Sequence, residues 1–175
     1  MRGWRSLVTA VVLVLCAVIE NTWLSVFDLP GAVPPLTLVV VFGFALRRAP
    51  FNAALIGFFG GVVIDLMPPS ATPLGITAFA FTAVGFGASL LRPYLEGSVI
   101  APLFAAGAAA IASLILRVVV SVAVGVEQNV VVEFLIVLIT SPLYSAMLAS
   151  VVLPLTSALD RMTAPRSTAN LFGSR

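Results

Sequence analysis

The sequence predicts an all-α integral membrane protein: one domain over residues 1–160, built as a bundle of six transmembrane helices. Of its 175 residues, 61% are hydrophobic and only 9% are charged, and the mean hydropathy is +1.17. Soluble domains carry about 25% charged residues, so this chain cannot cover a water-exposed surface. Its long apolar runs, separated by short turns rich in proline and glycine, are typical of membrane spans.

The apolar runs and the turns between them define the expected spans. Arg2 and Arg5 precede the first run, and because no small-residue cleavage site follows it, a retained helix is favoured over a secretory signal. Residues 28–31, 68–72 and 125–129 have turn chemistry. The expected spans are 6–27, 32–46, 51–67, 73–91, 98–124 and 130–159, followed by a short tail, 161–175, that we expect to be disordered.

The second span is the shortest. A helix over 32–46 reaches about 22 Å, less than the ~30 Å thickness of the hydrocarbon core. It is either a short full span or half of a re-entrant hairpin. The hairpin would bury Arg47 and Arg48 at its tip, at a cost of a few kcal/mol each, so we favour the short full span.

The arginines predict the orientation. Eight of the nine fall on one side of the membrane if the amino terminus is cytoplasmic: Arg2, Arg5, Arg47, Arg48, Arg92, Arg161, Arg166 and Arg175. The turns on the other side hold only Asp28 and Glu127 as charged residues. This is the positive-inside pattern, and it predicts that both termini are cytoplasmic. It constrains the orientation more firmly than the number of spans.

Four ionisable residues fall inside expected spans: Glu20, Asp65, Arg117 and Glu133. Counted from the nearest outer turn, Asp65 and Glu133 lie about 5 Å deep, and Glu20 and Arg117 about 10–12 Å deep. All four are therefore in the outer half of the membrane. An unpaired arginine there would be costly, so we expect Arg117 to pair with Asp65 or Glu20 first.

This intramembrane charge cluster has two interpretations. Intramembrane charges are candidates for a substrate or proton site. Alternatively, the cluster is an internal electrostatic tie that holds the spans in register. We favour the tie, because the chain has no histidine to relay protons near neutral pH.

A glycine-rich face on the third span predicts close helix packing. Gly57, Gly60 and Gly61 leave a smooth surface where another backbone can approach. The fifth span has a comparable face of small residues, formed by Ala101, Ala105, Ala108 and Ala112. We expect these two faces to pack on each other, with an external partner helix as the alternative.

No arrangement of residues points to catalysis. One cysteine and no histidine exclude an intramolecular disulfide and a Cys/His metal site. There is no nucleophile paired with a base and no phosphate-binding loop, and Asp65 and Asp160 fall on opposite sides of the bilayer. The arginines are too dispersed for nucleic-acid binding. We therefore expect a protein that is not an enzyme and that uses no metal or cofactor.

One stretch resembles a known family. Residues 57–66, Gly-Phe-Phe-Gly-Gly-Val-Val-Ile-Asp-Leu, end the third span with Asp65, and Pro73, Leu74 and Gly75 open the next. With the chain length and the expected topology, this motif resembles the rod-shape-determining MreD family. The intervening turn, 68–72, is richer in proline than the family pattern.

The resemblance implies a non-enzymatic scaffold of the cell-elongation machinery in the bacterial cytoplasmic membrane. Such a scaffold binds the single-span protein MreC. Through MreC it supports peptidoglycan synthesis by RodA and penicillin-binding protein 2, together with the actin-like filament of MreB. The resemblance also implies a fold similar to the substrate-binding subunits of energy-coupling-factor transporters.

That fold similarity provides the alternative function. The chain would be a small-molecule-binding subunit of a transporter, with an outer pocket lined by the four intramembrane charges. The outer turns are short and poor in hydrogen-bonding side chains, which argues against it. Binding or flipping of membrane lipid through the same residues stays open.

Overall fold

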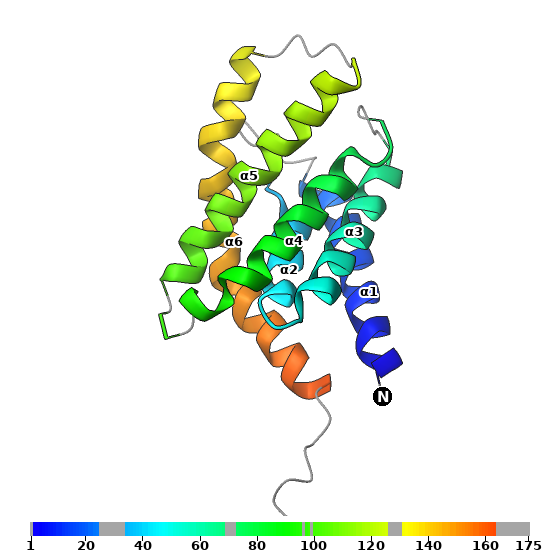
Figure 1. Ribbon diagram of the computed structural model, residues 1–175, viewed down its shortest axis with the longest axis vertical. Helices are drawn as coiled ribbons and strands as arrows, with labels where there is room; N and C mark the ends of the chain where they lie inside the picture. The colour runs from blue at the N-terminus through cyan, green and yellow to red at the C-terminus, as the bar shows by residue number, and fades with distance from the viewer. Residues whose placement is uncertain are drawn as a thin grey trace, which may run out of the picture.

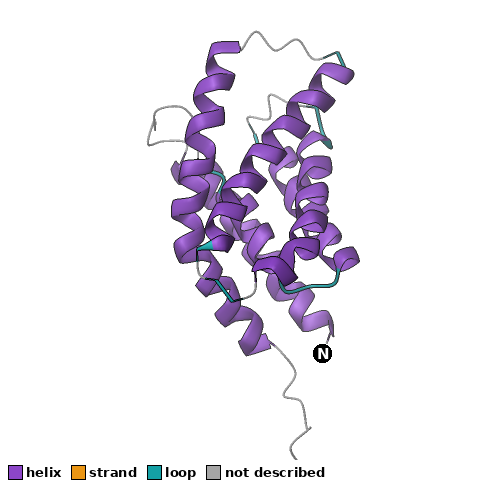
Figure 2. Ribbon diagram, turned by 60° about the vertical axis from the view of Figure 1, so that its left-hand side comes forward, coloured by secondary structure: helices purple, strands orange, loops and turns teal. Residues whose placement is uncertain are grey.

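The computed structural model describes residues 2–24, 34–68, 73–95, 97–98, 100–125 and 131–163. These residues form helices joined by short loops, with no strand among them (Figure 2). The all-α class is therefore confirmed. The elements are α1 Arg2–Ile19, the π-helical stretch η1 Glu20–Leu24, α2 Leu36–Ala45, α3 Pro50–Leu66, α4 Ile76–Leu95, α5 Ala101–Ala123 and α6 Val131–Thr163 (Figure 1).

Successive helices run in alternating directions along the long axis (Figures 1 and 2). As a result, the start of α1 and the end of α6 lie at the same end of the molecule, the lower end in Figure 1. The turn between α2 and α3 lies there as well, because Arg5 and Arg48 both bond to Asp160 of α6. We call this the arginine end, and the other the opposite end.

Helix α2 is the centre of the bundle. Every residue from Thr37 to Ala45 is buried, and the helix packs against α1, α3, α4, α5 and α6. A helix that is apolar all round is stable only when other elements enclose it. Its 10 residues span about 15 Å, but the surrounding helices shield it from the lipid, so its short length leaves no polar backbone exposed to hydrocarbon.

The described helices identify a multi-pass membrane protein. Four are long and apolar enough to cross a membrane, while α2 and α3 are shorter apolar helices. The candidate spans are Arg5–Thr22, Ile76–Leu95, Ala101–Ala123 and Ile136–Met162. Six complete crossings, and a full crossing by the second apolar run, remain predictions.

Two glycines of the α3 face, Gly57 and Gly61, pack on α4, while Gly60 faces the side chains of Val41 of α2 and Leu13 of α1. A Cβ at Gly57 would overlap the backbone carbonyl of Phe81, and one at Gly61 would overlap the backbone of Ala78. From the other side, a Cβ at Gly85 would come within 2.5 Å of the Ala53 carbonyl oxygen. The two backbones are in direct contact, which only residues without side chains permit.

The expected packing of this face on the fifth span was wrong. The nearest neighbours of Gly57 and Gly61 belong to α4, the next helix along the chain. On α5, Ala108 and Ala112 are exposed. Gly107 of α5 faces α6 instead, where a Cβ would lie 3.2 Å from the Pro142 carbonyl oxygen. Helices α3 and α4 pack directly on each other, and α5 packs on α6 and α4.

Candidate functional site

At the opposite end, Asp65 holds the start of α4. Its side chain is only 4% exposed, and Oδ2 accepts hydrogen bonds from the backbone N–H groups of Gly75, at 2.8 Å, and Ala78, at 3.1 Å. The first N–H groups of a helix have no partner within the helix, and a carboxylate there also interacts favourably with the helix dipole. Asp65 therefore caps α4 from the end of α3.

This cap explains the spacing between the aspartate and the Pro-Leu-Gly segment. Gly75 has φ +104°, a conformation that glycine adopts without strain, and in it the Gly75 N–H donates to Asp65. A Cβ at Gly75 would meet nothing within 4 Å, so glycine is required for its backbone conformation and not for space. Pro73 precedes the turn and Leu74 is 67% exposed.

Glu20 caps the start of α2, as Asp65 caps the start of α4. Its Oε2 accepts a 2.7 Å hydrogen bond from the backbone N–H of Thr37, in the first turn of α2. The residue before the helix, Pro35, makes no side-chain cap. Nearby, the side-chain amide of Asn21 donates to the carbonyl oxygen of Pro68 at 2.6 Å. The end of α1 is therefore bonded both to α2 and to the end of α3.

Arg117 of α5 is the positive charge that acts on the two capping carboxylates. It interacts electrostatically with Asp65 and, less strongly, with Glu20. Among the described residues it forms no direct ion pair, so its positive charge acts on both carboxylates through space. The structure thus brings together Glu20, Asp65 and Arg117, which we call the outer cluster. The side chain of Glu133 lies outside the described residues.

The outer cluster is surrounded by buried polar atoms without a hydrogen-bond partner. One is the second carboxylate oxygen of Asp65, and the others are hydroxyls of residues beside the caps or one turn from Arg117. They are Asp65 Oδ1, Thr77 Oγ1 and Ser121 Oγ, together with Thr37 Oγ1, which interacts with the Glu20 carboxylate without forming a well-directed hydrogen bond. Their unused capacity permits hydrogen bonds to a further polar group, whereas the capping oxygens are already engaged.

The capping role of the carboxylates and the three hydroxyl residues were not predicted from the sequence. The carboxylates were expected to pair with Arg117. A signal was present, because both α2 and α4 begin near proline with no Ser, Thr, Asp or Asn at the position where a helix is usually capped. A carboxylate from elsewhere in the chain was the remaining source of an acceptor.

The arginine end has its own charged cluster. Asp160 Oδ1 accepts from Arg5 Nη2 at 2.9 Å and from Arg48 Nη2 at 3.0 Å. It thereby joins α6 to α1 and to the turn between α2 and α3. Partial burial lowers the pKa of Arg48; Asp160 opposes this shift and Arg5 adds to it. One carboxylate is therefore shared between two guanidinium groups that repel each other.

We expect Glu20→Ala to destabilise the protein by about 1–3 kcal/mol, because the Thr37 N–H loses a charged acceptor in a buried place. The change is measured as thermal unfolding of the purified protein in detergent. Glu20→Gln is the matched control, since its amide oxygen can still accept this bond. An unchanged unfolding temperature for Glu20→Ala would contradict the capping role.

Comparisons with known proteins agree with the sequence motif. The sequence profile of the family described as rod shape-determining protein MreD matches residues 1–163. No match to a curated protein or to a solved structure reaches significance. The expected similarity to substrate-binding subunits of energy-coupling-factor transporters therefore remains a prediction.

Proposed function

Because the chain belongs to the MreD family of rod shape-determining proteins, we propose that it is the membrane scaffold through which MreC is held in the cell-elongation machinery. The family gives it a role in rod-shape determination. In the proposal, MreC binding supports peptidoglycan synthesis by RodA and penicillin-binding protein 2 during lateral wall growth, in concert with MreB. Both termini face the cytoplasm, where the arginine end would be placed by the positive-inside rule.

The observation that carries this proposal, beside the family, is the use of the intramembrane carboxylates. Glu20 and Asp65 each use one carboxylate oxygen to cap the start of a helix, and the positive charge of Arg117 on α5 offsets part of their negative charge. Groups committed to helix caps are poorly suited to proton transfer, which requires a freely available acceptor. A structural tie that presents a rigid outer surface to a partner fits a scaffold better than an enzyme.

The exposed apolar side chains supply surface for a single-span partner. Along α5 and α6, large residues point away from the bundle, among them Phe104, Val119, Ile139 and Val151. In a membrane these residues contact either lipid or another helix, and helix association there depends on packing rather than on hydrophobicity. The proposal therefore requires a well-packed contact with the MreC span.

The test is affinity purification of the tagged chain from its own membranes in mild detergent, followed by mass spectrometry. We expect MreC to be recovered in amounts comparable to the chain, and cells depleted of the chain to become round. Recovery of an ATPase module with a retained small molecule would instead support the transporter alternative. Depletion that leaves cell shape and wall synthesis unchanged would overturn the proposal.

A further inference from the structure

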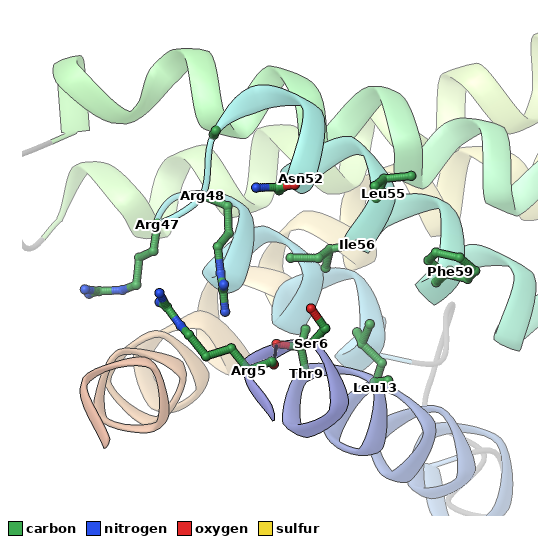
Figure 3. A pocket seen from close by; sticks show the side chains of 12 residues that line it. Arg5, Ser6, Thr9, Leu13, Arg47, Arg48, Asn52, Leu55, Ile56 and Phe59 are labelled. Carbon is green, nitrogen blue, oxygen red and sulfur yellow. Dashed lines mark hydrogen bonds between the residues drawn. The ribbon is translucent and has the colours of Figure 1, made fainter. Parts of the chain in front are cut away.

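A groove lies between α1 and α3 and opens at the arginine end (Figure 3). Its volume is about 590 Å³, within the range of small-molecule sites. One wall is formed by residues of α1, including Thr9 and Leu13, and the other by Asn52, Leu55 and Phe59 of α3. The groove is distinct from the outer cluster, which lies at the opposite end of the bundle and includes Arg117 of α5.

Three guanidinium groups converge at one end of the groove. Figure 3 shows the side chains of Arg5, Arg47 and Arg48 gathered there, from α1 and from the turn between α2 and α3. Asp160 neutralises one positive charge for the pair Arg5 and Arg48. Arg47 is exposed and takes part in no ion pair among the described residues. The mouth therefore keeps an excess of positive charge.

Two of these arginines also retain unused donors. The Nε atoms of Arg5 and Arg48 are buried and have no hydrogen-bond partner, although their Nη2 atoms bond to Asp160. A guanidinium offers its N–H groups in a planar fork that matches the oxygens of a phosphate or carboxylate. The buried donors thus favour an anion with several oxygens at this position.

Away from the arginines, the groove becomes apolar. Asn52 lies between the charged mouth and the residues Leu55, Ile56 and Phe59 of α3, with Leu13 of α1 opposite them (Figure 3). Phe59 lies farther along α3 from the charged mouth, and its side chain is 58% exposed. The order along the groove is cationic, then polar, then apolar, which is the order of phosphate, glycerol and acyl chain in a phospholipid.

The level of the groove in the membrane fits the same ligand. Its mouth lies where the chain leaves the apolar region, at the start of α1 and the end of α2. Basic pockets between transmembrane helices at this level are suited to anionic lipid headgroups. The arginines alone would be sufficient to bind a soluble anion. Such a ligand would make no use of the apolar half of the groove.

We propose that this groove binds one anionic phospholipid, with its phosphate held by Arg5, Arg47 and Arg48 and one acyl chain lying along Leu13, Ile56 and Phe59. The lipid enters from the leaflet at the arginine end. It bridges α1 and the turn between α2 and α3, where one carboxylate is shared between two arginines. Lipid binding thereby stabilises the arginine end.

The proposal is tested by native mass spectrometry of the chain, released from nanodiscs of equal parts phosphatidylglycerol and phosphatidylcholine. We expect the wild-type chain to retain one phosphatidylglycerol in preference to phosphatidylcholine. Arg47→Gln should reduce that retention roughly tenfold, because a charge-assisted hydrogen bond is lost. This variant is suitable because Arg47 is exposed and holds no ion pair in the described structure, so folding should be unaffected.

Arg92→Gln is the matched control, since Arg92 is exposed near the end of α4 and does not line the groove. It should retain the lipid as the wild type does. Equal retention of the two lipids by the wild-type chain would overturn the proposal, as would equal losses in both variants. Thermal stabilisation in detergent by inorganic phosphate as strong as that by phosphatidylglycerol would also overturn it, since that result would describe a simple anion site.

Discussion

Replacing Asp65 with alanine should destabilise the protein by about 3–5 kcal/mol. The change leaves the N–H groups of Gly75 and Ala78 without an acceptor at the start of α4, and hydrogen bonds to charged groups contribute about 1.5–3 kcal/mol each. It also removes the stronger of the two negative charges acting on Arg117, and uncompensated charge in the interior is costly. The measurement is thermal or denaturant unfolding of the purified protein in detergent.

Asp65→Asn separates the two contributions. Its amide oxygen can still accept from α4, but the negative charge is gone. Retention of most of the stability would assign the effect to the helix cap. A loss as large as in Asp65→Ala would assign it to the interaction with Arg117. A double-mutant cycle with Arg117→Leu measures that interaction directly, and wild-type stability of Asp65→Ala would contradict both roles.

Replacing Gly57 with alanine should destabilise the protein by at least about 2 kcal/mol. The new Cβ would overlap the Phe81 carbonyl, and because that atom belongs to the backbone of α4, no side-chain rotation relieves the overlap. The two helices must separate, which costs more than the small gain in helix propensity of alanine over glycine. The unfolding temperature in detergent and the recovery of folded protein on size-exclusion chromatography report the change.

Gly87→Ala is the matched control for this substitution. Gly87 is also helical, lies on α4 and has open space where a Cβ would be built. It should be neutral or stabilising by up to about 1 kcal/mol. If Gly57→Ala and Gly87→Ala behave alike, close contact between α3 and α4 is not what the glycine face provides.

Much of the outer cluster could be predicted from the sequence. The depth count placed Glu20, Asp65 and Arg117 in the outer half of the membrane, and the structure shows electrostatic interactions of Arg117 with both carboxylates. The motif from Gly57 to Gly75 marked the turn between α3 and α4. What the sequence could not supply was the hydrogen-bond partner of each carboxylate, because that partner is a backbone N–H, which every residue except proline carries.

The helix neighbours were harder to predict for a related reason. The small-residue faces of α3 and α5 have similar composition, and composition alone does not distinguish one close-packing partner from another. In the structure, it is α4 that packs against Gly57 and Gly61. The ion pair between Arg5 and Asp160 joins residues 155 positions apart, and no local sequence pattern predicts it.

The sequence alone was sufficient to identify a membrane protein made of helices with a family motif around Asp65, and it predicts that eight of the nine arginines lie on one side of the membrane. These properties follow from local composition, since transfer into lipid depends on each segment separately. Only the tertiary structure placed α2 at the centre, turned two intramembrane carboxylates into helix caps and brought three arginines to the mouth of one groove. Those arrangements depend on contacts between distant segments, whose geometry exists only after the helices have packed.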